Sequence, residues 1–242
     1  MMKQYERTDL RVLKEDRFLR FCEVSYRCVG SKFSSPLESP VQSSYDRRWE
    51  IIQRTTCPIP LAKCLKSPVP FAVDGAEICA FLRRLDETFL ILVAQYRPPV
   101  DAIVVEFPAG LVDPTEDVKH AAIRELREET GYVATEEDII SVSGVLSYEP
   151  GLTNSACQIV KILIDGEKEV NKNPKQYLED GEDIDVILLP IRSKKLDTEK
   201  ESPLQFLHNL IKENNIFQTR TVIDAKLYAF LDGISLMESL SW

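Results

Sequence analysis

Residues 124–132, RELREETGY, constrain the fold more than any other stretch of the chain. Glu125, Glu128 and Glu129 are spaced i, i+3 and i+4, which places their carboxylates on one face of a helix within one turn. Like charges at this spacing destabilise a helix unless something neutralises them. Gly131 follows, and glycine is the residue that most often ends a helix. We therefore expect a helix that ends at Gly131 and carries an acidic face.

The acidic face has two interpretations. Arg124 and Arg127 on the same helix can pair with the carboxylates and give a solvated, salt-bridged surface, which is the usual meaning of a run of charges. Alternatively, the carboxylates bind a divalent metal ion such as Mg²⁺, which takes oxygen ligands from proteins and from substrate phosphates. The helix alone leaves both interpretations open.

Short apolar runs typical of β-strands surround this helix. They cover residues 76–85, 88–96, 101–110, 138–148, 156–166 and 183–191, with a hairpin connection expected at 86–88. Residues 203–215 and 221–240 have the apolar spacing of helices. The charged stretch 166–183 is too polar to bury, so we expect a long surface loop there. These elements predict an α/β fold with a mixed sheet flanked by helices.

The first part of the chain differs from the rest. Residues 30–44 are rich in serine and proline and are typical of a loop, and the apolar pattern strengthens from Trp49 onward. We therefore divide the chain into an N-terminal region, residues 1–56, with β-strands and this loop, and a main domain, residues 57–242.

Charge and composition narrow the class of protein. The net charge of −9 argues against general binding to nucleic acids or membrane surfaces, because both are anionic. No segment has the apolar length of a signal peptide or a membrane span. The six cysteines and two histidines lack the paired spacing of a zinc site, so reduced thiols are expected. We expect a cytoplasmic protein, with the nucleus as a second compartment.

The residues before the helix decide between the two interpretations of its acidic face. Gly110, Glu116 and the helix fit the pattern Gly-x5-Glu-x7-Arg-Glu-U-x-Glu-Glu-x-Gly-U, where U is a bulky aliphatic residue; Tyr132 departs from it at the last position. This segment resembles the Nudix box, and so many fixed positions make a chance match improbable. The resemblance implies a Nudix α/β/α sandwich with a mixed β-sheet and a small N-terminal β region. It also implies that the carboxylates hold metal ions that bridge a diphosphate.

Further segments resemble the ADP-ribose (ADP-sugar) pyrophosphatases of this family, namely residues 47–56, 95–113, 148–154 and 180–190. This resemblance implies hydrolysis of ADP-ribose, or of a related ADP-sugar, to AMP and ribose 5-phosphate, with Mg²⁺ or Mn²⁺ as the cofactor. It also implies a homodimer whose N-terminal regions are exchanged. NADH, a dinucleoside polyphosphate, an oxidised nucleotide or a nucleotide sugar stay open as substrates. A Nudix fold that only binds a nucleotide or a partner protein is disfavoured, because it needs no complete set of metal carboxylates.

The same resemblance implies roles for individual residues. It implies Glu125, Glu128, Glu129 and the backbone carbonyl of Ala109 as metal ligands. Glu182 becomes the general base, supplied by a mobile loop on the water side of the phosphorus, with Glu128 and Arg124 as further catalytic residues. Plain solvation is the alternative for Glu182, and the acidic residues at 179, 180, 183 and 185 leave the identity of the base open.

For the substrate, the resemblance implies contacts from six residues. Trp49 and Phe18 would stack on adenine, Arg54 and Arg97 would contact phosphates or ribose, and Glu149 and Leu111 complete the set. A packing anchor is the alternative for the tryptophan, and a structural salt bridge is the alternative for either arginine.

Overall fold

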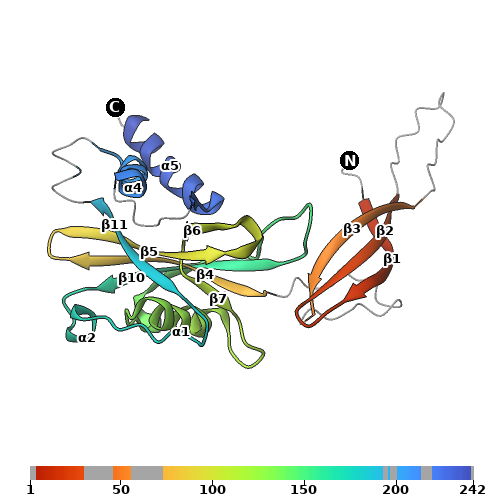
Figure 1. Cartoon of the computed structure of the whole chain (residues 1–242), viewed down its shortest axis with the longest axis horizontal. Coiled ribbons are helices and arrows are strands. Elements are labelled where there is room, and N and C mark those ends of the chain that lie inside the picture. The colour runs from red at the N-terminus through yellow and green to blue at the C-terminus, as the bar shows by residue number, and fades with distance from the viewer. Residues whose placement is uncertain are drawn as a thin grey trace. The chain divides into compact units, whose positions relative to one another are not determined.

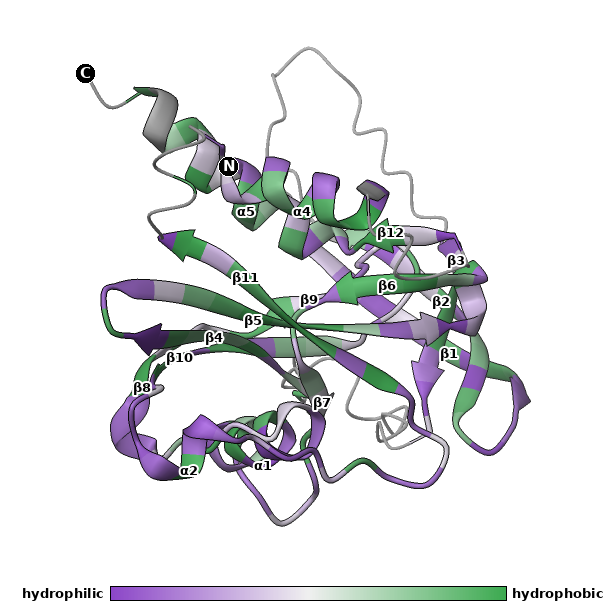
Figure 2. Ribbon diagram, turned by 60° about the vertical axis from the view of Figure 1, so that its left-hand side comes forward, coloured by the Kyte–Doolittle hydropathy of each residue, from purple (hydrophilic) through white to green (hydrophobic). Residues whose placement is uncertain are grey.

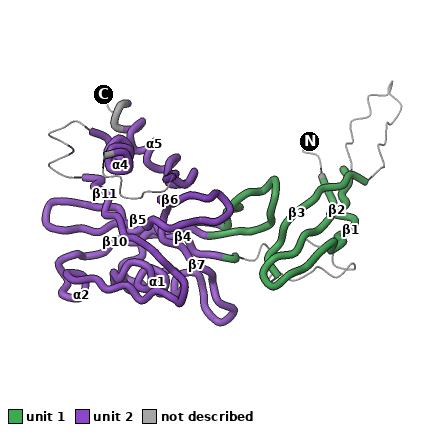
Figure 3. The backbone as a smooth tube through the Cα atoms, in the orientation of Figure 1, with its two compact units in different colours: residues 1–74, 145–157 green, residues 75–144, 158–242 purple. Residues whose placement is uncertain are grey.

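The computed structural model of the chain describes residues 4–29, 46–55, 73–192, 196, 201–213 and 220–240. The chain divides into two compact units, residues 1–74 with 145–157 and residues 75–144 with 158–242 (Figure 3). The serine- and proline-rich stretch at 30–44 and the domain boundary predicted at residue 57 lie outside the described residues. Within the described residues, no helix is both long and apolar enough to cross a membrane.

The first unit contains a three-stranded antiparallel sheet. Its strands are β1 (Gln4–Glu15), β2 (Leu19–Val29) and β3 (Arg47–Arg54), with β2 in the centre. Trp49 lies opposite Val24 in the register of β2 and β3, and Arg54 lies opposite Leu19. This sheet is the small N-terminal β region that the resemblance implied.

The second unit is built on a mixed sheet, in which the strand order is β12-β6-β5-β4-β10-β8. β5 pairs antiparallel with β4, β6 and β11, whereas β12 runs parallel to β6. The short strand β7 pairs with β4. β9 pairs with the first residues of β10, and these paired residues belong to the first unit. The strand bounds are β4 Gly75–Arg84, β5 Glu87–Arg97, β6 Ala102–Glu106, β7 Ala109–Leu111, β8 Ile139–Val142, β9 Leu146–Ser147, β10 Ala156–Asp165, β11 Ile184–Arg192 and β12 Thr221–Ile223.

Helices cover both faces of this sheet. α1 (Val118–Thr130) lies on one face, and α4 (Pro203–Glu213) and α5 (Ala225–Leu240) lie on the other (Figure 1). Each layer has its own apolar core: Leu126 of α1 is buried against the sheet on one side, and Leu207 and Leu227 are buried on the other. Figure 2 shows the apolar strands between these helices. The predicted α/β/α sandwich with a mixed sheet is confirmed.

The ends of α1 are set by two local interactions. The side chain of Asp117 caps the helix N-terminus, because its Oδ1 accepts hydrogen bonds from the N–H groups of Lys119 (2.9 Å) and His120 (3.0 Å). Gly131 ends the helix with φ of 76°, a left-handed conformation that favours glycine. A Cβ at this position would also overlap the backbone of Lys175. The predicted end of the helix is confirmed.

Tyr132 stands where the motif has an aliphatic residue, and its surroundings explain how it is accommodated. Its ring is buried in the core beneath α1. Its hydroxyl accepts a hydrogen bond from Nη2 of Arg84 (3.2 Å), whose guanidinium lies 5.9 Å from the ring centroid. The polar end of the buried ring is therefore satisfied.

The structure corrects several predicted elements of the sheet. The hairpin turn is formed by Leu85 and Asp86, and residues 87–88 already belong to β5, because Arg84 pairs with Glu87. The run at 101–110 forms two strands, β6 and β7, separated by Phe107-Pro108. The run at 138–148 likewise divides into β8 and β9. Residues 221–223, predicted as helix, form β12 and pair with β6.

The charged stretch at 166–183 is more ordered than its composition indicates. It contains a short helix, α2 (Glu169–Lys172), and the side chain of Asn171 is fully buried. That amide bonds both the N–H (2.8 Å) and the carbonyl (3.1 Å) of Val133 and the carbonyl of Asp165 (3.1 Å). One asparagine therefore fixes this segment to the core. Two 3-10 turns, η2 (Pro98–Val100) and η3 (Glu136–Asp138), complete the described elements of this unit.

Candidate active site

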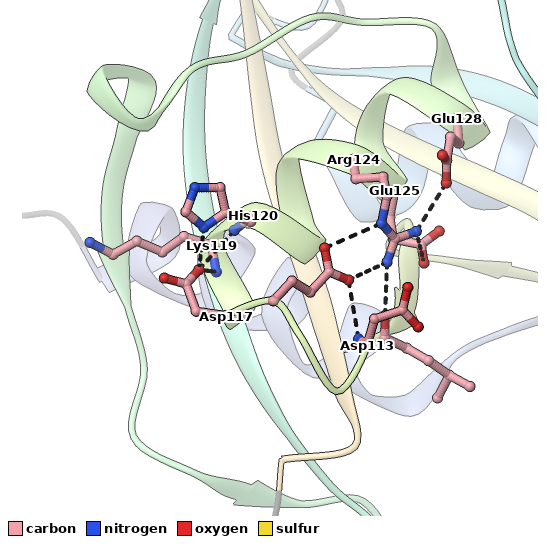
Figure 4. Close-up of polar contacts among 9 residues, drawn as sticks. Asp113, Asp117, Lys119, His120, Arg124, Glu125 and Glu128 are labelled. Carbon is pink, nitrogen blue, oxygen red and sulfur yellow. Dashed lines mark hydrogen bonds and ion pairs between the residues drawn. The ribbon is translucent and has the colours of Figure 1, made fainter.

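Arg124 lies at the centre of a cluster of carboxylates on α1 and in the loop before it (Figure 4). It pairs with Glu116 (2.6 Å), Glu125 (2.8 Å) and Glu128 (3.0 Å), and it donates a hydrogen bond to the carbonyl of Leu111 (3.0 Å). The hydrogen bond from Arg124 lowers the pKa of Glu116, and the same bond is the largest cause that raises the pKa of the arginine. The salt-bridged interpretation therefore describes three of the carboxylates in this structure.

Glu129 is in a different position from the other carboxylates of the helix. It is 4% exposed, and its Oε2 accepts a hydrogen bond from the N–H of Ala109 (3.0 Å). Its pKa is raised to about 8, chiefly by burial, with a contribution from the charges of Glu125 and Glu182 and an opposing effect of that hydrogen bond. No arginine or lysine pairs with Glu129 among the described residues. A buried carboxylate without a cation fits a site that binds one.

Gly110 explains how the acidic face approaches β7. The carboxyl group of Glu125 lies so close to the α-carbon of Gly110 that a Cβ there would overlap it. Burial raises the pKa of Glu125, and the hydrogen bond from Arg124 opposes that effect. The glycine of the motif therefore leaves the space that Glu125 occupies.

The oxygen atoms on this face are of the kind that a hard divalent cation takes as ligands. Glu125, Glu128 and Glu129 offer carboxylate oxygens, and the backbone of Ala109 lies directly against Glu129. Within the described parts of the chain, no three acidic, histidine or cysteine side chains are already gathered as a ligand set. Arg124 holds one oxygen each of Glu125 and Glu128, and the second oxygen of each carboxylate is the one left for a metal ion. The ligand assignment stays a prediction.

Glu182 belongs to the loop before β11, and its charge affects the pKa of carboxyl groups on the acidic face of α1. Its Oε2 accepts a hydrogen bond from the N–H of Glu179 (2.9 Å), and its own N–H donates to the carbonyl of Glu179 (3.1 Å). Although burial is the main cause, the charge of Glu182 contributes to the raised pKa of both Glu125 and Glu129. The charge of Glu182 therefore acts on two of the predicted metal ligands, and its role as the base stays a prediction.

Arg97, a predicted substrate contact, has a partner in this structure. Its Nε donates to Oε1 of Glu106 over 2.8 Å. Burial raises the pKa of Glu106, and the charge of Arg97 opposes that shift. The salt-bridge interpretation therefore holds for Arg97, and its contact with substrate stays a prediction.

Of the other five predicted substrate contacts, Leu111 lies at the end of β7 in the second unit, and four belong to the first unit. Trp49 is about half exposed (52%), and its Nε1 donates to the carbonyl of Gly151 (2.9 Å). Nε of Arg54 is buried without a hydrogen-bond partner among the described residues. Glu149 is exposed, and its carbonyl accepts from the N–H groups of Leu152 (3.0 Å) and Thr153 (2.9 Å).

Phe18 is 64% exposed at the turn between β1 and β2, with the guanidinium of Arg17 over its ring at 4.7 Å. It precedes Val24, the residue opposite Trp49, by six positions. Six residues of strand span about 20 Å. Phe18 and Trp49 of one chain are therefore too far apart to cover both faces of one adenine.

Sequence reasoning missed the structural roles of three residues. Glu116 matched the motif, but its pairing with Arg124 was not predicted. Glu106 had no signal at all, because its partner Arg97 lies on a different strand, where it is opposite Ala102 and not Glu106. Gln176 had none either: its Nε2 donates to the carbonyls of Glu129 (2.7 Å) and Ile184 (2.8 Å), a contact that depends on how the loop packs.

Comparisons with known proteins agree with this site. The family described as the NUDIX domain matches residues 75–210, which include β4, the motif, α1 and the Glu182 loop. The ADP-sugar pyrophosphatase of Mus musculus is 33% identical over 196 residues, 81% of this chain and 76% of that protein. The ADP-ribose pyrophosphatase of Saccharomyces cerevisiae is 41% identical over 115 residues, 47% of this chain and 48% of that protein.

A solved structure described as an ADP compounds hydrolase has the same fold. It covers 100% of this chain and 99% of its own, with a TM-score of 0.52 and 17% sequence identity. The family match over more than half of the chain, together with the relatives and the Glu-rich face of α1, assigns a family and an enzyme class. The chain belongs to the Nudix hydrolases and is a pyrophosphatase that resembles the ADP-ribose pyrophosphatase subfamily.

Proposed function

We propose that this enzyme hydrolyses the diphosphate of ADP-ribose to AMP and ribose 5-phosphate, or that of a related ADP-sugar to AMP and the corresponding sugar phosphate, with Mg²⁺ as its metal ion. Nudix hydrolases act with divalent metal ions. The observation that carries the proposal is the position of Glu182, whose charge acts on both Glu125 and Glu129 from a separate loop. The choice of an ADP-sugar is supported by the similarity to the mouse and yeast enzymes.

Glu125, Glu128, Glu129 and the carbonyl of Ala109 would hold the metal. Bound there, it would offset the negative charge of the diphosphate and polarise the phosphorus. Mn²⁺ would serve the same ligands, because it also accepts carboxylate oxygens.

The base has a defined task in this reaction. Glu182, as a carboxylate, accepts a proton from the attacking water while the water oxygen forms a bond to one phosphorus. The bond between that phosphorus and the bridging oxygen breaks, and the other phosphate leaves with the oxygen. One Glu182 oxygen already accepts the N–H of Glu179, which orients the carboxylate and leaves the second oxygen for the proton.

We also propose that the enzyme acts as a homodimer. Phe18 lies in the turn before β2, six residues before the residue opposite Trp49, so an adenine stacked on both faces needs rings from two chains. Their exposure, 52% and 64%, leaves both rings available. Light scattering at assay concentration tests this proposal, and a fully active monomer would rule it out. The cytoplasmic location expected from the sequence stays a prediction.

A substrate panel tests the proposed reaction. ADP-ribose, ADP-glucose, NADH, a diadenosine polyphosphate and an oxidised nucleotide are incubated with Mg²⁺, with Mn²⁺ and with a chelator, and products are separated by chromatography. We expect AMP and ribose 5-phosphate from ADP-ribose, the largest kcat/KM for an ADP-sugar, and no turnover with the chelator. Preference for NADH or a dinucleoside polyphosphate would refute the proposed substrate, and binding without hydrolysis would refute the reaction.

A further inference from the structure

Hydrogen bonds connect the loop that carries Glu182 to the C-terminal end of α1. The last carbonyls of a helix have no partner within the helix and need donors from elsewhere. The N–H of Tyr177 donates to the carbonyl of Glu128 (2.8 Å), and Nε2 of Gln176 donates to the carbonyl of Glu129 (2.7 Å). The loop therefore bonds to the backbone of two residues whose side chains form the acidic face.

Gln176 makes a second hydrogen bond that closes the loop. The same Nε2 donates to the carbonyl of Ile184 (2.8 Å), at the start of β11 and two residues after Glu182. A primary amide nitrogen carries two hydrogens, so both bonds use its full donor capacity. One side chain thus joins the end of the helix to both ends of the segment that contains Glu182.

Further contacts hold the same loop. The guanidinium of Arg127 lies 5.0 Å from the ring centroid of Tyr177. Gly131 lets the backbone of Lys175 approach the helix end, since a Cβ would overlap it. At the other end of the loop, Glu179 and Glu182 bond each other through backbone and side chain. The loop is thus fixed at its base by Gln176 and at its tip by a turn.

We infer that Gln176 is the positioning residue of the general base: its amide sets the distance between the Glu182 carboxylate and the acidic face of α1. Gln176 has no contact with the reacting atoms and acts through the loop backbone. This inference rests on the proposed role of Glu182 as the base. The sequence predicts a mobile loop here, whereas these contacts anchor the loop before substrate binds.

The inference separates kcat from KM. Since a displacement of about 1 Å at a reacting group can cost about 10²-fold in rate, Gln176→Leu should lower kcat about 10- to 100-fold. KM should change less than about threefold, because no predicted substrate contact is removed. Gln158→Leu is the matched control: Nε2 of Gln158, in β10, also donates to a backbone carbonyl, that of Ser143 (2.7 Å), directly after β8. Its kcat should stay within twofold of the wild-type value.

A double-mutant cycle shows whether Gln176 acts through the base. In a Glu182→Gln background, Gln176→Leu should cause no further loss of kcat, because a misplaced base and an absent base have the same effect. An equal loss in both backgrounds, or a normal kcat in Gln176→Leu, overturns the inference. A normal kcat in Glu182→Gln overturns the proposed base, and this inference with it, whereas a low kcat there with a normal kcat in Gln176→Leu overturns this inference alone.

Hydrogen exchange of the wild-type protein gives a test that needs no variant. The N–H groups of Tyr177 and Glu179 donate to the helix carbonyl and to the Glu182 carboxylate in the absence of substrate. Both should therefore exchange more slowly than open loop amides before any substrate is added. Exchange at open-loop rates, with protection only after a non-hydrolysable ADP-sugar analogue is bound, overturns the inference.

Discussion

The carboxylate of Glu129 accepts a hydrogen bond from the backbone N–H of Ala109 over 3.0 Å, although burial raises the pKa of this side chain to about 8. Its neighbour Glu128 is paired with Arg124 and is partly exposed. Two adjacent glutamates of one helix are therefore held in different ways, one against β7 and one by an arginine. Substitution of either glutamate should lower kcat, whereas only Glu129 is expected to govern the pH dependence of stability.

Glu128→Gln and Glu129→Gln should each lower kcat by about 10²-fold or more, because each removes a negative charge from the metal-binding face. The fold should persist, since neither change removes apolar packing. Steady-state kinetics at saturating Mg²⁺ and circular dichroism measure the two effects. Near-normal turnover in both variants would refute the metal assignment.

Gly110→Ala separates the geometry of the site from the stability of the fold. The new Cβ would overlap the carboxyl group of Glu125, which is the far end of a flexible side chain and can rotate away. We expect kcat to fall about tenfold or more, with a free energy of unfolding within about 1 kcal/mol of the wild type. Gly144→Ala, where a Cβ meets no atom within 4 Å, is the matched control. Equal kcat in the two variants would contradict the role given to Gly110.

The pH dependence of stability follows from Glu129. Its pKa in the folded, metal-free protein is about 8, above the ordinary value of 4.5, so the folded state binds more protons than the unfolded state between these values. Stability should therefore fall as pH rises from about 5 to about 8. Thermal unfolding in the presence of a chelator measures this slope, and Glu129→Gln should flatten it. An unchanged slope in the variant would assign the effect to other groups.

Trp49→Ala should affect binding far more than chemistry. Stacking of a ring on a base contributes about 1–3 kcal/mol, and adenine is remote from the bond that breaks. KM for ADP-ribose should therefore rise roughly 5- to 150-fold at nearly constant kcat. Trp49→Phe keeps a ring but loses the hydrogen bond to Gly151, so its KM should stay close to the wild-type value. A KM increase of similar size in both variants would assign the effect to packing within the first unit.

A structural feature of this protein can be predicted from the sequence when it depends on residues that are close together in the chain. The helix end at Gly131, the acidic face and most strands follow from spacing within a few residues, and all appear in the structure. The strand at 221–223 was missed because its β structure comes from pairing with β6, and three residues carry no distinctive period. The polarity of the segment that contains Asn171 and Gln176 predicts an exposed surface loop. Their hydrogen bonds to distant backbone groups reverse that expectation.

The same limit applies to the site. The motif identified the carboxylates of α1. Nothing in its spacing indicates that Arg124 pairs with three carboxylates, whereas Glu129 accepts a hydrogen bond from the N–H of Ala109 in β7. The choice among the acidic residues at 179–185 was also open in the sequence. The charge of Glu182 acts on both Glu125 and Glu129, and its role as the base stays a prediction.

The central claim is that Glu182 is the base, and the most direct measurement is kcat for Glu182→Gln with ADP-ribose, beside Glu179→Gln and Asp183→Asn. A base acts only in the transition state, so Glu182→Gln should lose about 10²–10⁴-fold in kcat with little change in KM. The two controls should stay close to the wild type, since the bonds that Glu179 makes to Glu182 come from its backbone. Loss of kcat in Glu179→Gln or Asp183→Asn with normal turnover in Glu182→Gln would contradict the claim and assign the base to that residue.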